Sequence, residues 1–124
     1  MKKAHELYDC NYPADYDPII ESFGEVLIKV DDDDYQGDSR VLLKDGNKYG
    51  VLIFGFGSCS GCDRLQACNN FNEIDELIQD MHNDIHWFNS LEECKKWAEE
   101  RDWELQHSWH CKETKDFVNK LLNY

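Results

Sequence analysis

The sequence has few positively charged residues. It contains 13 lysines and arginines against 26 aspartates and glutamates, which gives a formal net charge of −13. Nucleic acids and anionic membranes bind proteins through Lys and Arg, so a chain with this charge is repelled by both. We therefore expect no direct nucleic-acid partner and no membrane partner. The charge favours a protein partner with a basic surface instead.

Long apolar runs and prolines are also scarce. The longest apolar run, 51–56, is far shorter than the about 20 residues that a transmembrane helix needs. No apolar segment follows the basic residues at the start of the chain, so we expect a cytoplasmic protein without a signal peptide. The two prolines, Pro13 and Pro18, form no linker, and the length is that of one domain over residues 1–124.

Apolar periodicity predicts an α+β fold. Alternation and a turn at Asp45-Gly46-Asn47 predict antiparallel strands at 25–30, 40–44 and 49–56. The third strand is apolar on both faces, which indicates that helices or a second copy of the chain cover it. Helical spacing and the capping residues Asn70 and Ser90 predict the helices. The predicted helices are 71–84, 91–100 and 114–122, with a short extended piece at 86–88 and a further strand at 103–109.

These segments form the expected core over 25–124, an antiparallel sheet of three to four strands with three or more helices packed on it. Residues 1–24 are expected to be an N-terminal arm or a short helix beside that core.

The segment after the third strand is the most unusual one. It reads Gly57-Ser58-Cys59-Ser60-Gly61-Cys62-Asp63. Glycine and serine suit a tight loop whose backbone comes close to a metal, a ligand or another chain. We expect this loop to form a ligand or partner site with Trp109 and His110, which interrupt another aromatic-rich segment.

Cys59 and Cys62 permit several interpretations. In a reducing cytosol, free thiols or a metal site are expected of the six cysteines. The pair has the spacing of half a zinc site, with His110 as a further ligand, but a second C-x-x-C is absent. A thioredoxin-type redox pair would need a proline downstream, and both prolines lie upstream. The remaining alternatives are buried small residues or a backbone nest for a polar ligand.

No catalytic constellation accompanies the loop. The sequence offers no Ser-His-Asp order, no phosphate-binding loop and no paired-carboxylate cleft, so we expect a binding protein rather than an enzyme, with zinc as the one candidate cofactor. Two groups of acidic residues are candidate partner surfaces. One group lies just before the strand predicted at 40–44 and consists of Asp31, Asp32, Asp33, Asp34 and Asp38. The other group lies on the polar side of helix 71–84 and consists of Asp75, Glu76, Asp80 and Asp84.

Three segments together resemble a family of small, mostly uncharacterised bacteriophage proteins. They are Tyr35-Gln36-Gly37-Asp38, the segment from Gly57 to Asp63, and Asp102-Trp103-Glu104 leading to Ser108-Trp109-His110. The resemblance spans roughly residues 30–122 and implies a phage accessory protein in the host cytoplasm, with no reaction attached. Small acidic phage proteins commonly bind a host protein stoichiometrically, as anti-CRISPR and other anti-defence inhibitors do. A small-molecule sponge or enzyme using the cysteine loop, and a zinc-stabilised module, are the alternatives.

Overall fold

Four strands and five helices make up the described part of the chain. The computed structural model describes residues 2–8, 15–58, 61, 63–103, 105 and 111–124. In chain order the elements are α1 (Ala4–Leu7), α2 (Asp17–Phe23), β1 (Glu25–Asp31), β2 (Gly37–Asp45), β3 (Lys48–Phe56), α3 (Phe71–Asp84), β4 (His86–Phe88), α4 (Leu91–Glu100) and α5 (Cys111–Leu122). The strands form one antiparallel sheet in the order β1-β2-β3-β4. The predicted α+β fold is therefore confirmed.

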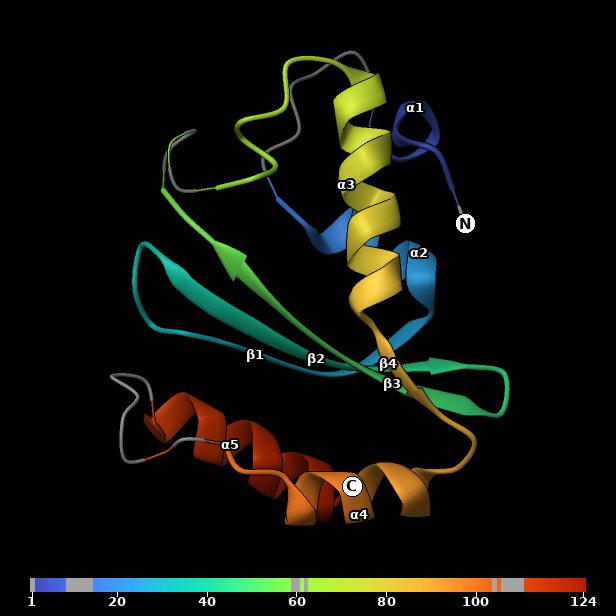
Figure 1. The fold of residues 1–124 in the computed structure, drawn as a ribbon, viewed down its shortest axis with the longest axis vertical. Helices are drawn as coiled ribbons and strands as arrows, with labels where there is room; N and C mark the ends of the chain where they lie inside the picture. The colour runs from blue at the N-terminus through green and yellow to red at the C-terminus, as the bar shows by residue number, and fades with distance from the viewer. Residues whose placement is uncertain (1, 9–14, 59–60, 62, 104, 106–110) are drawn as a thin grey trace.

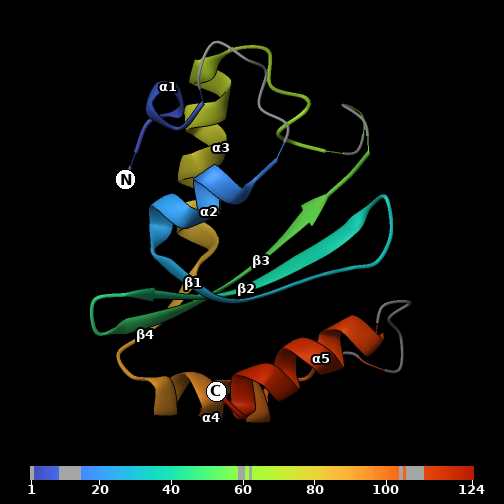
Figure 2. The ribbon, with the colours of Figure 1, turned by 180° about the vertical axis from the view of Figure 1, so that it is seen from behind.

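The sheet lies between two layers of helices. The first layer, α1 to α3, covers one face, and α4 and α5 cover the other (Figures 1 and 2). Val41 and Leu52 pack in the core under the first layer, and Leu42 and Val51 pack in the core under the second. Because successive strand side chains point to opposite faces, β2 and β3 are apolar on both. Helices, rather than a second copy, provide the cover on both faces.

A tight turn joins β2 to β3. Gly46 has a φ of 61°, in the left-handed region that glycine adopts without strain. Asp45 pairs with Lys48 directly across the turn, and the pairing continues to Gly37 and Phe56 at the far end of both strands. The predicted hairpin is confirmed, and its register brings the end of β3 beside the start of β2.

The helix starts predicted after Asn70 and Ser90 are confirmed as well. The Asn70 side chain accepts a hydrogen bond from the backbone N–H of Glu73 (2.9 Å), and the Ser90 hydroxyl accepts one from that of Glu93 (3.2 Å). Helix α5 begins at Cys111, three residues before the predicted start. None of the helices in the described ranges is long and apolar enough to cross a membrane.

The N-terminal segment contributes more to the core than the sequence indicated. Residues 1–24 were expected to lie beside the core, yet Ile19, Ile20 and Phe23 of α2 are buried in it. The exposed fraction of each of these residues is 5% or less. Helix α2 has seven residues, too few for a helical period to stand out in the sequence. Residues 1–24 thus contain the short helix that was one of the two expectations, and the core extends beyond 25–124 to include α2.

The expected strand at 103–109 falls mostly outside the described residues. Its described members, Trp103 and Leu105, are not in a strand. The Trp103 indole N–H donates to the carbonyl of Ala98 (2.9 Å), and its ring packs against Trp97 and Phe117. The apolar character of Trp103 thus reflects packing between α4 and α5, not a sheet edge.

Candidate functional site

A buried carboxylate closes the loop that follows β3. Asp63 is 6% exposed, and its Oδ2 accepts a hydrogen bond from the backbone N–H of Gly57 (2.9 Å). Its Oδ1 accepts from the backbone N–H groups of Leu65 (2.9 Å) and Gln66 (3.1 Å). One side chain therefore joins the two ends of the 57–63 loop and caps the turn that follows it.

Tyr16, at the start of α2, holds the same carboxylate. Its hydroxyl donates to Asp63 Oδ1 (2.8 Å) and accepts from the backbone N–H of Leu65 (3.2 Å). Burial raises the pKa of the Tyr16 phenol well above its ordinary value, and the charge and hydrogen bond of Asp63 act in the same direction. The phenol therefore stays protonated and remains a donor throughout the physiological pH range.

The predicted metal site, Cys59, Cys62 and His110, lies outside the described residues. These include none of Cys59, Ser60, Cys62, Trp109 and His110, so the composite site and its zinc stay predictions. Of the loop residues that are described, Gly57 is half-buried while Ser58 and Gly61 are exposed. Across the described ranges, no group of three His, Cys, Asp or Glu side chains is placed to hold a metal ion.

The described cysteines near the core are poor nucleophiles. Cys94 is fully buried on α4, as expected, and burial raises the pKa of its thiol to about 11. Cys68 is buried too, its pKa is raised chiefly by that burial, and its thiol donates to the carbonyl of Arg64 (3.2 Å). Since the thiolate is the reactive form, both residues serve packing.

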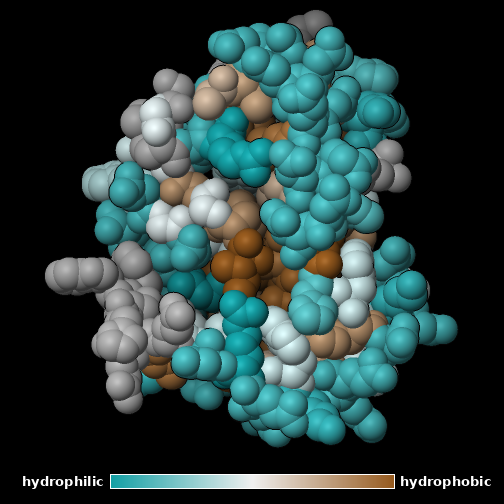
Figure 3. Space-filling view, viewed as in Figure 1, coloured by the Kyte–Doolittle hydropathy of each residue, from teal (hydrophilic) through white to brown (hydrophobic). Residues whose placement is uncertain are grey.

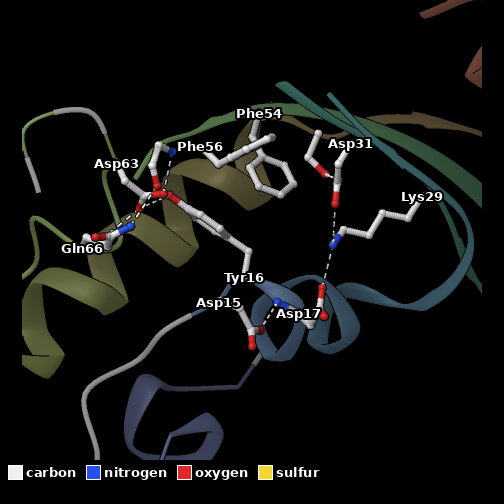
Figure 4. A pocket seen from close by; sticks show the side chains of 11 residues that line it. Asp15, Tyr16, Asp17, Lys29, Asp31, Phe54, Phe56, Asp63 and Gln66 are labelled. Atoms are coloured by element: carbon white, nitrogen blue, oxygen red, sulfur yellow. Dashed lines mark hydrogen bonds and ion pairs between the residues drawn. The ribbon is translucent and has the colours of Figure 1, made fainter. Parts of the chain in front are cut away.

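A pocket of about 200 Å³ opens beside the loop (Figure 4). Five segments far apart in the chain line it: the start of α2, the end of β1, the start of β2, the end of β3 and the turn after Asp63. Their residues are Asp15, Tyr16, Asp17, Lys29, Asp31, Ser39, Phe54, Phe56, Gly57, Asp63 and Gln66. The sequence indicated Asp31, Gly57 and Asp63 as site residues, and the structure brings these three to one cavity.

One side of the pocket is an ion-pair network. Lys29 Nζ lies 2.9 Å from Asp17 Oδ1 and 3.3 Å from Asp31 Oδ2. Burial alone would lower the pKa of the Lys29 ammonium, but its contacts with the two aspartates outweigh burial and leave that pKa raised. The Ser39 hydroxyl also donates to Asp31. The exposed Asp15, whose carboxylate accepts a hydrogen bond from the backbone N–H of Asp17 (2.9 Å), also lines this side. Three carboxylates and one ammonium therefore line this side of the pocket, which is negative.

Aromatic rings form the middle of the pocket. The Tyr16 and Phe54 rings lie 4.8 Å apart between centroids, tilted by 49°, and Phe56 lies beside them (Figure 4). On the far side, the Gln66 amide donates to the carbonyl of Gly57 (2.9 Å). The cavity is thus aromatic at its centre, acidic at one end and closed by hydrogen-bonded loop backbone at the other.

The first predicted acidic surface needs one correction. Asp31, Asp33, Asp34 and Asp38 are exposed, but Asp32 is 6% exposed and therefore is not part of a surface. The Arg40 guanidinium contacts Asp32 Oδ1 at 2.7 Å, and the backbone N–H of Asp38 donates to Asp32 Oδ2 (2.8 Å). Asp32 is an internal brace that shapes the turn on which its acidic neighbours are displayed.

The second predicted acidic surface lies elsewhere on the molecule. Glu76, Asp80 and Asp84 are exposed on α3, where the surface is largely hydrophilic (Figure 3). Asp80 pairs with Arg64 (2.8 Å), and Asp75 is half-buried and accepts from the backbone N–H of Ala4 (2.7 Å). Helix α3 and the β1–β2 turn are well separated in both ribbon views (Figures 1 and 2). The two groups therefore do not form one continuous patch.

A second hollow extends the first acidic surface instead. It lies between the end of β1 and the start of α5, has a volume of about 610 Å³, and shares Asp31 with the pocket. Asp33, Glu113 and Asp116 line it together with two lysines of α5, Lys112 and Lys115. Acidic side chains from α2, the β1–β2 turn and α5 thus follow one another around this end of the sheet.

Sequence reasoning missed most of the pocket. It did not single out Asp17, Lys29, Phe54 or Gln66. One signal was present: Pro18, in the first turn of α2, marks a helix start that would have placed Tyr16 and Asp17 at a helix end. Comparisons of the chain with protein-family models, with curated proteins and with solved structures found no match.

Proposed function

We propose that the protein acts by stoichiometric binding to a partner protein with a basic surface. One observation carries the proposal: acidic side chains from three separate segments gather around the pocket and the adjoining hollow, joined through Asp31. A single surface charge contributes little to affinity, but several together raise the rate at which an oppositely charged protein associates. This gathering of acidic side chains supports binding as the proposed function.

The resemblance to phage proteins extends this proposal to a host target in the cytoplasm. A host protein that grips nucleic acid carries a groove of Lys and Arg, and an acidic protein competes with phosphates for that groove. Inhibition of such a protein, in the manner of an anti-CRISPR or other anti-defence factor, is the biological role that we propose.

A small-molecule site is the second candidate, since the cysteine loop borders the pocket through Gly57 and Asp63. The pocket's about 200 Å³ is below the roughly 300–1,000 Å³ that sites for drug-sized ligands occupy. Its size thus fits one side chain of a partner better than a nucleotide or larger metabolite.

Two variants of equal charge test the proposal. The first carries Asp17→Asn, Asp33→Asn and Asp38→Asn on the pocket side, and the second carries Glu76→Gln, Asp80→Asn and Asp84→Asn on α3. All six residues are exposed, so each variant has a net charge of −10 instead of −13. The tagged wild-type protein and both variants would be used to capture partners from host cells, and the captured complex would be weighed by native mass spectrometry.

We expect a one-to-one complex that the wild type and the α3 variant retain and the pocket-side variant loses. Equal retention by all three proteins would contradict the proposal, because it would show that the captured protein does not recognise this acidic surface. If only the α3 variant loses the captured partner, the protein still binds through its charge, but the binding surface is the acidic group on α3 and not the one around the pocket.

A further inference from the structure

We propose that the pocket beside the loop binds the guanidinium group of an arginine from the partner protein, an inference that rests on the proposed function. The charges around the pocket favour a cation. Three exposed carboxylates, those of Asp15, Asp17 and Asp31, line the opening, and the Lys29 ammonium, which contacts Asp17 and Asp31, is the one cationic side chain among the described lining residues. An anionic group entering here would meet a negative field, whereas a cation is attracted.

The aromatic centre of the pocket also favours a cation. Tyr16, Phe54 and Phe56 line it, and the faces of aromatic rings attract cations. Together, the rings and the carboxylates offer a cation two favourable environments, one for the flat face of the group and one for its N–H donors. Figure 4 shows this order along the cavity, with the rings between the ion-pair network and the Asp63 end.

The position of Lys29 favours arginine over lysine as the bound residue. A compact ammonium is already present, since Lys29 bridges Asp17 and Asp31 at 2.9 and 3.3 Å. A second ammonium would compete for the same carboxylate oxygens. A guanidinium is planar, weakly hydrated and able to stack on rings while it forks to a carboxylate, so it uses the aromatic centre that Lys29 leaves open. Elsewhere in the chain the Arg101 guanidinium lies 5.0 Å from the centroid of the Trp97 ring and 4.8 Å from that of the Trp103 ring, closer than the Lys44 ammonium, which lies 5.9 Å from that of the Tyr49 ring.

Short peptides provide the test without the partner. The probes are acetyl-Gly-Arg-Gly-amide, the same peptide with lysine, and the same peptide with citrulline, which keeps the planar shape of arginine but has no charge. Each would be titrated into the ¹⁵N-labelled full chain and followed by NMR. We expect the arginine peptide to shift the signals of Tyr16, Gly57 and Gln66 in a saturable way, with a dissociation constant on the order of millimolar.

The lysine peptide should bind at least about threefold more weakly, and the citrulline peptide should not saturate. Phe56→Leu keeps an apolar strand residue but removes the ring, and it should weaken arginine binding about two- to fivefold. Phe71→Leu, at an aromatic residue that is 38% exposed on α3, is the matched control and should leave binding unchanged. A melting curve for each variant shows that it folds.

Equal shifts from all three peptides, or shifts confined to α3, would overturn the inference. The two proposals can fail separately. If the captured partner loses affinity for the pocket-side charge variant but dissociates from Phe56→Leu as slowly as from wild type, the pocket inference fails and the proposed function stands. If the arginine peptide saturates the pocket and the charge variant still retains the partner, the proposed function fails and the ligand assignment stands.

Discussion

Asparagine at position 63 is expected to destabilise the protein and open the loop. The asparagine keeps the shape of Asp63 but replaces one carboxylate oxygen with an NH₂ group. Oδ1 accepts three hydrogen bonds, from Tyr16, Leu65 and Gln66, so the amide oxygen should take that place. The NH₂ group then takes the place of Oδ2, which lies 2.9 Å from the backbone nitrogen of Gly57. Two hydrogen-bond donors therefore face each other, and the bond is lost.

The expected cost follows from these contacts. An unsatisfied donor in a buried position costs about 1–3 kcal/mol, and the three remaining bonds lose the charge of their acceptor, so the free energy of unfolding should fall by about 2–4 kcal/mol. Urea unfolding measures this change directly. Amide hydrogen exchange should also become faster at Gly57 than at residues of α3, because the loop loses its closing bond.

Asp80→Asn is the matched control for this experiment. Asp80 is exposed and forms a surface ion pair with Arg64, so its replacement should change stability by no more than about 1 kcal/mol. If Asp63→Asn unfolds within about 0.5 kcal/mol of the wild type, which is typical of surface substitutions, the carboxylate does not hold the loop and the account of its closure is wrong.

Three other properties are open to measurement. Asp32→Ala leaves the Arg40 guanidinium buried without this partner, so the free energy of unfolding in urea should fall by about 3–5 kcal/mol. A fall of less than about 1 kcal/mol would show that Asp32 does not stabilise the turn. The raised pKa of the Cys94 thiol means that the unfolded chain loses this proton first, so stability should fall as the pH rises from about 9 toward 11. The Cys94→Ala variant should lose less stability over this pH range than the wild type. If both proteins have the same pH dependence, the Cys94 thiol does not cause the loss. Protein purified without a chelator should contain zinc if Cys59, Cys62 and His110 bind it, and less than about half an equivalent would count against the site.

Local features of the fold were predictable because local sequence determines them. The Gly46 turn and the caps at Asn70 and Ser90 each depend on residues three or four positions apart, and all three are where the sequence placed them. The apolar faces of β3 predicted a buried strand for the same reason. The burial of helix α2 was not predicted because a single buried turn, Ile19 to Phe23, is too short to show a period.

The pocket could not be predicted because its contacts join distant parts of the chain. Tyr16 meets Asp63 across 47 positions, and Lys29 meets Asp17 across 12. The sequence also does not distinguish aspartates that are buried and structural from aspartates that are exposed and available to a partner. Asp32 and Asp63 are buried acceptors of backbone N–H groups, whereas Asp33 and Asp38 are exposed, and all four look alike in a sequence.

The salt dependence of association tests the central claim most directly. The association rate of the purified partner with wild type would be measured from about 0.05 to 0.5 M salt, over which the Debye length falls from roughly 14 to 4 Å. We predict a steep fall in rate for wild type and the α3 variant, and a slower, flatter profile for Asp17→Asn/Asp33→Asn/Asp38→Asn. A rate that is independent of salt and equal in all three proteins would contradict the claim that the acidic surface around the pocket recognises a basic partner.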